Sequence, residues 1–222
     1  MKVTDKITIT NECNMLLMAR YPDNYFDLAI VDPPYGIHNK ITNNGNLTQS
    51  KGNKFAINYD KKQWDKFRPI NDYWQELLRV SKNQIVCGGN YFAEKLPVSR
   101  GWIVWDKQGE GMSSVNNELI YTSFDISIKT FSRCHGLDKG FMAKGIDKVF
   151  HPTQKPQKLY KWLLDNYAKE GDKILDTHLG SGSIAIAAHD YKYELTACEL
   201  DKEYYDKAIQ RIINHTNQTK LF

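Results

Sequence analysis

The sequence predicts an α/β protein in which helices cover both faces of a mostly parallel, doubly wound sheet. The chain has 222 residues, of which 41% are hydrophobic, and this is enough for the core of one domain. Short apolar runs that end in Gly, Asp or Pro alternate with stretches of helical periodicity. Because this alternation is typical of parallel sheets, we expect a single domain over residues 1–222.

Each element is expected from its own pattern. The short apolar runs predict strands at residues 6–10, 26–31, 84–87, 102–105, 173–175 and 194–198. Apolar residues spaced by three and four predict helices at residues 13–20, 72–80, 157–168 and 201–214. In the last of these helices, Tyr204, Ala208 and Ile212 fall on one stripe, which we interpret as core.

The chain carries no sign of a secreted or membrane protein. It lacks a run of roughly 18 apolar residues, the length of a transmembrane helix, and its N-terminus lacks the apolar core of a signal peptide. Its 4 cysteines are far apart and form no Cys-x-x-Cys pair, so neither a zinc site nor a disulfide framework is indicated. We expect a cytoplasmic protein with reduced thiols, no membrane partner and no metal.

Two segments interrupt the alternation. Residues 36–63 are rich in polar residues without an apolar period, which is typical of a mobile functional loop. Residues 107–150 hold an aromatic and basic run around Arg133 and are interpreted as an inserted recognition segment. The net charge of +4 is compatible with a polyanionic partner, although a solvated loop explains the lysines of the first segment equally well. These lysines are Lys51, Lys54, Lys61 and Lys62.

A glycine-rich turn follows the strand at 173–175. It begins with Asp176-Thr177-His178, continues through Gly180-Ser181-Gly182 and leads into an alanine-rich helix. Glycines here permit positive φ and let a ligand approach the bare backbone. The next strand ends at Glu199, where an acid can bind ribose hydroxyls. Together these residues predict a pocket for an adenosyl cofactor.

Two adenosyl cofactors compete for this pocket. The spacing of Gly180, Gly182 and Ala185 is close to the pattern of an NAD-type dinucleotide site, which needs a helix N-terminus free of negative charge. The acids Asp176 and Glu199 lie nearby, and they favour S-adenosylmethionine, which is cationic and has no phosphate. A turn that binds nothing remains the third alternative.

The Asp32-Pro33-Pro34-Tyr35 turn follows the strand at 26–31. In an open parallel sheet, ligands bind beyond the carboxyl ends of the strands. Two prolines make the turn rigid and leave its carbonyls free, so an Asp32 oxygen and a proline carbonyl form a pair of acceptors. This pair suits the exocyclic amine of adenine or cytosine, and Tyr35 can stack on the base.

The motif order requires the two ends of the chain to be neighbours. The chain ends one helix after Glu199, whereas its start supplies a strand at 6–10, the acid Glu12 and then the strand before Asp32. Joined circularly, the units therefore run from the glycine turn through two acids to the Asp-Pro-Pro-Tyr turn.

These motifs resemble those of the beta-class amino-group DNA methyltransferases, in which the catalytic motif comes first and the donor site last. The third motif is His151-Pro152-Thr153-Gln154-Lys155-Pro156, before a helix. The resemblance covers nearly the whole chain, including residues 80–92, 102–107 and 118–123. One departure is Thr177-His178, because the family commonly has Pro-Phe at this place, so the aromatic contact with the donor is open.

The resemblance implies a Rossmann-like S-adenosylmethionine-dependent methyltransferase fold, circularly permuted, with a small target-recognition insertion at 107–150. It implies transfer of a methyl group to N6 of an adenine flipped out of double-stranded DNA. The catalytic residues would be Asp32, Pro33, Pro34 and Tyr35. The donor would be bound by Glu12, Thr153, Gln154, Lys155, Asp176, Thr177, His178, Gly180, Ser181, Gly182 and Glu199. DNA would be contacted by Lys51, Lys54, Lys61, Lys62 and Arg133.

Several alternatives stay open at this point. N4-cytosine methylation uses the same amine chemistry, although that group more often has serine in place of Asp32. An RNA or protein amide acceptor would more usually show asparagine there. An NAD-dependent oxidoreductase and a non-catalytic DNA-binding protein are the alternatives from other classes. Members of the resembled class often form homodimers or accompany a restriction endonuclease, and the sequence leaves both partners open.

Overall fold

The computed structural model describes residues 1–37, 68–107, 117–132, 151 and 153–217. Most of the loop expected at 36–63 and much of the segment 107–150 lie outside these ranges, as do all five residues expected to contact DNA. They are Lys51, Lys54, Lys61, Lys62 and Arg133.

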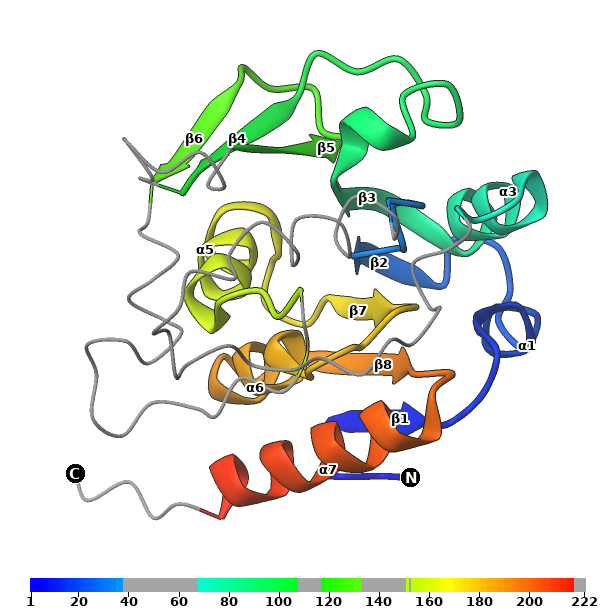
Figure 1. Cartoon of the computed structure of the whole chain (residues 1–222), viewed down its shortest axis with the longest axis vertical. Helices are drawn as coiled ribbons and strands as arrows, with labels where there is room; N and C mark the ends of the chain where they lie inside the picture. The colour runs from blue at the N-terminus through cyan, green and yellow to red at the C-terminus, as the bar shows by residue number, and fades with distance from the viewer. Residues whose placement is uncertain (38–67, 108–116, 133–150, 152, 218–222) are drawn as a thin grey trace, which may run out of the picture.

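The described residues form one sheet of eight strands in the order β1-β8-β7-β2-β3-β5-β4-β6 (Figure 1). The pairs are parallel except where β5 pairs with β3 and β4. The strands are β1 (Ile7–Thr10), β2 (Phe26–Val31), β3 (Ser81–Cys87), β4 (Trp102–Asp106), β5 (Glu118–Thr122), β6 (Lys129–Ser132), β7 (Lys173–Asp176) and β8 (Glu194–Cys198).

Helices cover the sheet on both sides, as Figure 1 shows. Alternate residues of β2 point to opposite faces: Leu28 and Ile30 pack in one core with α5, α6 and α7, and Ala29 and Val31 pack in a second core with α1 and α3. The helices are α1 (Asn14–Met18), α3 (Asn71–Val80), α5 (Gln157–Tyr167), α6 (Ser183–Asp190) and α7 (Lys202–Thr216), with a 3-10 turn η1 (Gly89–Tyr91).

The expected strands and helices are confirmed, with boundaries that differ by a few residues. Two further strands were not expected: β5 and β6 lie within residues 107–150 and belong to the central sheet. This range is therefore not wholly an insertion, because Ile120 and Tyr121 of β5 are buried in the two cores. The expected neighbourhood of the chain ends is confirmed by the parallel pairing of β1 with β8.

The register brings the ends of four strands together. Ala29 of β2 pairs with Leu175 of β7, Asp176 of β7 pairs with Ala197 of β8, and Thr10 of β1 pairs with Cys198. Asp32, Thr177, Glu199 and Glu12 therefore follow the sheet at one edge, near the junction of β7 and β2, where ligands bind in open α/β sheets.

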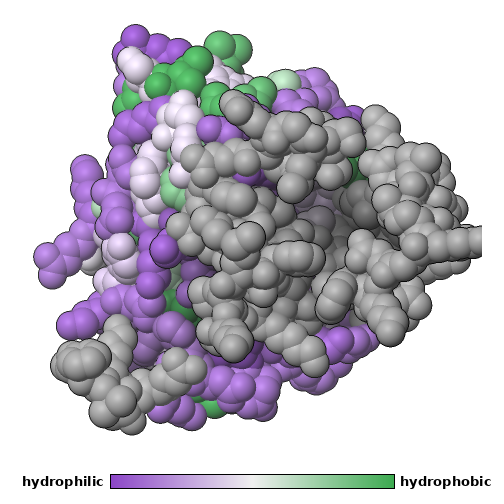
Figure 2. Space-filling view, turned by 60° about the vertical axis from the view of Figure 1, so that its left-hand side comes forward, coloured by the Kyte–Doolittle hydropathy of each residue, from purple (hydrophilic) through white to green (hydrophobic). Residues whose placement is uncertain are grey.

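The molecular surface visible in Figure 2 is mostly hydrophilic where the residues are described, and its hydrophobic residues gather at the end where β4, β5 and β6 lie. Val98 and Ile128 are among the exposed large hydrophobic residues. Among the described residues, no helix is both long and apolar enough to cross a membrane.

Candidate active site

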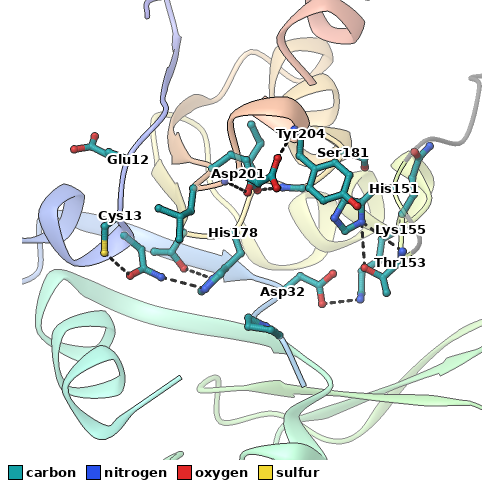
Figure 3. Close-up of a pocket in the computed structure, with 18 of the residues that line it drawn as sticks. Glu12, Cys13, Asp32, His151, Thr153, Lys155, His178, Ser181, Asp201 and Tyr204 are labelled. Carbon is teal, nitrogen blue, oxygen red and sulfur yellow. Dashed lines mark hydrogen bonds and ion pairs between the residues drawn. The ribbon is translucent and has the colours of Figure 1, made fainter. Parts of the chain in front are cut away.

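A cavity of about 530 Å³ opens at the carboxyl edge of the sheet, within the usual range of small-molecule sites (Figure 3). Both motifs contribute to its wall, since Asp32 and Pro34 face it from the proline turn and Gly180 and Ser181 from the glycine turn. Other residues expected to bind a cofactor also line it. They are Glu12, Thr153, Gln154, Lys155, Thr177, His178 and Glu199.

Four expected site residues do not line the cavity: Pro33, Tyr35, Asp176 and Gly182. Pro33 is buried, and Tyr35 lies behind Asp32. The Asp176 carboxylate is 2% exposed and accepts the backbone N–H of His178 at 2.9 Å. Burial raises the pKa of Asp176 to about 8, against the effect of that hydrogen bond. Asp176 therefore keeps its proton at neutral pH and contributes less negative charge to the rim than the sequence suggests.

Several lining residues were missed by the sequence analysis. Tyr204 belongs to the apolar stripe of α7, yet its ring meets the His151 imidazole at 4.5 Å between centroids. Tyr160 similarly belongs to the apolar face of α5. A helical stripe does not distinguish a residue that faces the core from one that faces a cavity within it. The missed residues are Cys13, Asn14, His151, Tyr160, Leu179, Leu200, Asp201 and Tyr204.

Glu199 shapes the glycine turn. Its two carboxylate oxygens accept the backbone N–H groups of Gly180 and Asp201, each at 2.9 Å. Gly180 has φ +53° and Gly182 has φ +76°, a backbone region that glycine adopts without strain. Because the Gly180 N–H is bonded to a carboxylate, it is not available to a phosphate group.

His178 belongs to a chain of polar side chains at one side of the cavity (Figure 3). The Asn14 amide nitrogen lies 3.1 Å from Nε2 of His178, and Nδ1 lies 2.9 Å from Oγ1 of Thr177. Thr177 in turn lies 2.8 Å from the Tyr73 hydroxyl. Burial lowers the pKa of His178 to about 3, so the ring is neutral. Because the Asn14 amide donates to Nε2, the proton resides on Nδ1 and is donated to Thr177.

Glu12 is at the side of the cavity opposite Lys155 (Figure 3). Its carboxylate accepts two hydrogen bonds from the Arg20 guanidinium, at 2.6 and 2.7 Å. These hydrogen bonds lower the pKa of Glu12, so it is ionised at neutral pH.

Asp32 is held from behind by two donors. Its Oδ1 accepts the Tyr35 hydroxyl at 2.8 Å and the Lys155 ammonium at 2.7 Å. Its Oδ2 has no partner among the described residues. The Tyr35 ring stacks on Tyr91 with centroids 4.8 Å apart. Because Lys155 also lines the cavity, it joins the acid of the proline turn to the space expected to hold the cofactor.

Among the lining residues that the structure describes, carboxylates outnumber cations. They include Glu12, Asp32, Glu199 and Asp201, whereas the one described lysine, Lys155, is paired with Asp32. In addition, Gln154 is 9% exposed and its Oε1 has no hydrogen-bond partner among the described residues. A buried acceptor of this kind requires a donor, so the cavity suits a cationic ligand with N–H or O–H groups.

A second group of possible ligands lies beside the cavity. Oxygens of Asp32 and Glu118 and the sulfur of Cys87 lie within 4.8 Å of one another, as metal ligands can. The Lys155 ammonium contacts both carboxylates, at 2.7 and 3.2 Å. A positive charge is thus already supplied to this group by the chain itself.

Comparison with known proteins finds a family model and relatives that resemble this chain. Residues 104–210 match the family model described as DNA methylase. The type II methyltransferase M2.DpnII of Streptococcus pneumoniae is 23% identical over an alignment 255 residues long, gaps included. The alignment covers 96% of this chain and 92% of that protein.

Solved structures with a similar fold are also found. The M1.HpyAVI–SAM complex has a TM-score of 0.58 at 16% identity, covering 92% of this chain and 99% of that one. The cytosine-N4-specific PvuII DNA methyltransferase has a TM-score of 0.57 at 14% identity, covering 95% and 92%. At these identities the likeness establishes the fold.

Proposed function

We propose that this chain, whose residues 104–210 match the DNA methylase family model, transfers a methyl group from S-adenosylmethionine to N6 of adenine in double-stranded DNA. The observation that carries the proposal is the position of Asp32. Its Oδ2 has no partner in the part of the chain that the structure describes, and Asp32 lies on a cavity whose other wall is the glycine turn.

The chain's own residues fit this donor. The excess of carboxylates over cations around the cavity suits a ligand with a sulfonium and an ammonium group. Glu199 and Glu12 would face its adenosyl part, and Gln154 would accept one of its hydrogen bonds. Once bound, S-adenosylmethionine supplies an electrophilic methyl carbon, whose bond to sulfur breaks as the bond to the amino nitrogen forms.

The proline turn would prepare the amino group. Asp32 and a carbonyl of the turn accept its two N–H groups, which draws the nitrogen lone pair out of conjugation with the ring. Most of the acceleration then comes from the fixed placement of the nitrogen against the methyl carbon. Tyr35 does not line the cavity, and Tyr91 covers one face of its ring. The base would therefore stack on Tyr35 only by taking the place of Tyr91.

The choice of adenine rests on Asp32. Members of the family that methylate cytosine more often have serine at this place, and one similar structure belongs to such an enzyme. The test is transfer of labelled methyl to unmethylated genomic DNA, followed by nucleoside analysis. We expect N6-methyladenine. Finding N4-methylcytosine would replace the adenine assignment, and no incorporation at all would overturn the proposal.

An Asp32→Ala variant separates catalysis from DNA binding. We expect the rate of methyl transfer to fall at least about 100-fold, while the affinity for S-adenosylmethionine is retained. Equal methylation by the variant and the wild type would contradict the role of Asp32 and favour a protein that only binds DNA.

The NAD-dependent alternative is disfavoured by the glycine turn. A pyrophosphate needs free N–H groups at such a turn, whereas Glu199 already accepts the N–H of Gly180. Fluorescence titration with the two cofactors tests this. Saturable binding of S-adenosylmethionine without binding of NAD is expected, and the reverse result would restore the alternative.

The partners beyond DNA belong to the same proposal. The resemblance to the beta-class amino-group DNA methyltransferases implies that such partners are common, and on this ground we propose a companion restriction endonuclease and a homodimer for this chain. Light scattering during size-exclusion chromatography checks the second point. A mass of one chain at micromolar concentration would contradict it.

A further inference from the structure

Behind Asp32 lies a buried group of charged and polar side chains from four parts of the chain. Asp32 and Tyr35 follow β2, Glu118 begins β5, Lys107 follows β4, and Lys155 precedes α5. We refer to these five residues as the Asp32 cluster. The side chains of Lys155 and Glu118 are only 4% and 11% exposed, so their charges depend on one another rather than on water.

Lys155 is the centre of the cluster. Its ammonium group has three N–H donors and lies 2.7 Å from Oδ1 of Asp32, 3.0 Å from the Tyr35 hydroxyl and 3.2 Å from Oε1 of Glu118. Three donors thus meet three acceptors. The Tyr35 hydroxyl accepts from Lys155, and its single proton faces Oδ1 of Asp32 at 2.8 Å and Oε1 of Glu118 at 3.0 Å. The contact with Asp32 is the shorter of the two, and the Lys155 ammonium already occupies Oε1 of Glu118.

Glu118 is bound on its other side as well. Its Oε2 pairs with the Lys107 ammonium at 3.0 Å, whereas Asp32 has no second cation among the described residues. The two carboxylates therefore differ. Glu118 is fixed between two lysines, whereas Asp32 shares one of them, and its Oδ2 contacts no polar group in the described ranges.

We propose that Glu118 is a positioning residue for methyl transfer: by anchoring Lys155 it keeps both donors on Oδ1 of Asp32, so that Oδ2 alone meets the amino group of the base. The inference rests on the proposed function. It also decides which acid takes the proton that the amino nitrogen sheds as its bond to the methyl carbon forms. That proton goes to Oδ2 of Asp32, and Glu118 stays ionised.

The charges support this division of roles. Burial raises the pKa of Asp32, Lys155 opposes the rise and Glu118 adds to it. Burial also acts to raise the pKa of Glu118, but Lys155 and Lys107 outweigh it and lower this pKa to about 2. For Lys155, burial is outweighed by the two carboxylates, which raise its pKa.

Three further groups face Asp32 from neighbouring elements: Cys87 of β3, Tyr160 of α5 and Asp176 of β7. Burial raises the pKa of each of them, so all three are uncharged at neutral pH. The electrostatic environment of Asp32 is thus set by Lys155 and Glu118.

The test compares single-turnover methyl transfer by wild type and Glu118→Gln as a function of pH. The reaction needs ionised Asp32, so its rate falls as the pH falls through the pKa of Asp32. We expect the variant to be about 10- to 100-fold slower. The acidic limb of its pH–rate profile moves to lower pH, because an anion beside Asp32 has been removed. Its affinity for S-adenosylmethionine stays at the wild-type value.

Two further variants sharpen the comparison. Glu118→Asp keeps the charge but retracts it, so the rate should fall while the acidic limb stays in place. Glu76→Gln removes another acid that lies in an ion pair, with Arg79 on α3, and should behave as wild type. A wild-type rate and an unshifted acidic limb in Glu118→Gln would overturn the inference.

A readout without DNA separates this inference from the proposed function. Carboxyl-carbon NMR of the protein alone reports the pKa of Asp32, which Glu118→Gln should lower, and it also reports on any variant too slow to assay. If the wild type methylates no DNA but the shift occurs, the proposed function fails and the cluster stands. If the wild type is active and Asp32 does not respond to Glu118→Gln, the inference fails alone.

Discussion

At position 178, a histidine stands where members of the resembled family commonly have phenylalanine. The ring keeps an aromatic contact, since it meets Tyr73 edge-on at 5.3 Å between centroids. It adds two polar contacts that phenylalanine lacks, with Asn14 and Thr177. The departure therefore replaces an apolar wall of the cavity with a neutral ring held in one tautomer, and it couples α1 to the glycine turn.

This residue makes stability depend on pH. Burial lowers the pKa of His178 to about 3 in the folded protein, whereas the unfolded chain binds the proton below about pH 6.5. The unfolded state is therefore favoured progressively as the pH falls from 6.5 towards 3, by about 2 kcal/mol at pH 5.

Urea unfolding of wild type and His178→Phe at pH 7 and pH 5 measures this effect. At pH 7 we expect the variant to be about 1 kcal/mol less stable, because Asn14 and Thr177 lose a partner. At pH 5 that deficit should vanish or reverse. The raised pKa of Asp176 favours the folded state as the pH falls, opposite to the effect of His178. Because Asp176 is present in both proteins, its contribution cancels in their comparison. If wild type and His178→Phe lose the same free energy of unfolding between pH 7 and pH 5, the low pKa assigned to His178 is contradicted.

Among the elements, the turn between β7 and α6 depends on glycine for two separate reasons. Gly182 has φ +76°, and a Cβ added there would lie 3.0 Å from Cδ1 of Ile212 on α7. Gly171 also has a positive φ, +87°, but a Cβ there would meet nothing within 4 Å. The pair separates backbone strain from close packing.

Replacing each glycine by alanine should reveal the difference. Gly171→Ala should cost about 1–2 kcal/mol in the free energy of unfolding, from its backbone conformation alone. Gly182→Ala should cost more, because Ile212 must also shift, and it should weaken donor binding. Denaturant titration and donor binding measure both quantities. Equal costs and unchanged affinity would show that the packing on α7 is immaterial.

The start of α7 joins helix capping to the cavity. The Asp201 carboxylate accepts the backbone N–H groups of Glu203 and Tyr204 at 2.9 and 3.0 Å, and Asp201 also lines the cavity. Asparagine keeps the cap without the charge, whereas alanine removes both.

Asp201→Asn should therefore leave the free energy of unfolding nearly unchanged and weaken the binding of the cationic donor. Asp201→Ala should lose about 1 kcal/mol of stability in addition. Calorimetric titration and urea unfolding test the pair. If asparagine binds the donor as tightly as aspartate, the charge of Asp201 does not face the ligand.

Much of the element order could be predicted, because apolar runs and helical stripes are local signals. The strand β5 was missed although Ile120 is buried, since it enters the sheet between β3 and β4 out of chain order. For the same reason the sequence could not indicate that Glu118 meets Lys155. Glycine and proline motifs identified both walls of the cavity, but the position of Tyr204 required the packing of α7.

For the molecule as a whole, the interaction with DNA is a matter of charge. The net charge is +4, and the lysines proposed to contact phosphates belong to residues 36–63. Each neutralised phosphate contributes about 0.9 to the slope of log affinity against log salt concentration. A loop that binds through several lysines should thus reveal itself in this slope.

Replacing Lys54, Lys61 and Lys62 by alanine should reduce the magnitude of that slope by up to about 2.7. The control replaces Lys82, Lys202 and Lys207, each of which lies in an exposed ion pair, and changes the net charge equally. Fluorescence anisotropy over a salt series measures both. The loop assignment is wrong if the two triple variants give the same slope.

The sheet order has a consequence for biosynthesis. β7 and β8 lie between β1 and β2, although ribosomes make β1 and β2 first. A nascent chain therefore carries the proline corner long before it has anything to hold a methyl donor, and the gap beside β2 is filled only when the final quarter emerges. A translation product that stops before β7 therefore has the Asp-Pro-Pro-Tyr turn but lacks the glycine turn that forms the other wall of the cavity.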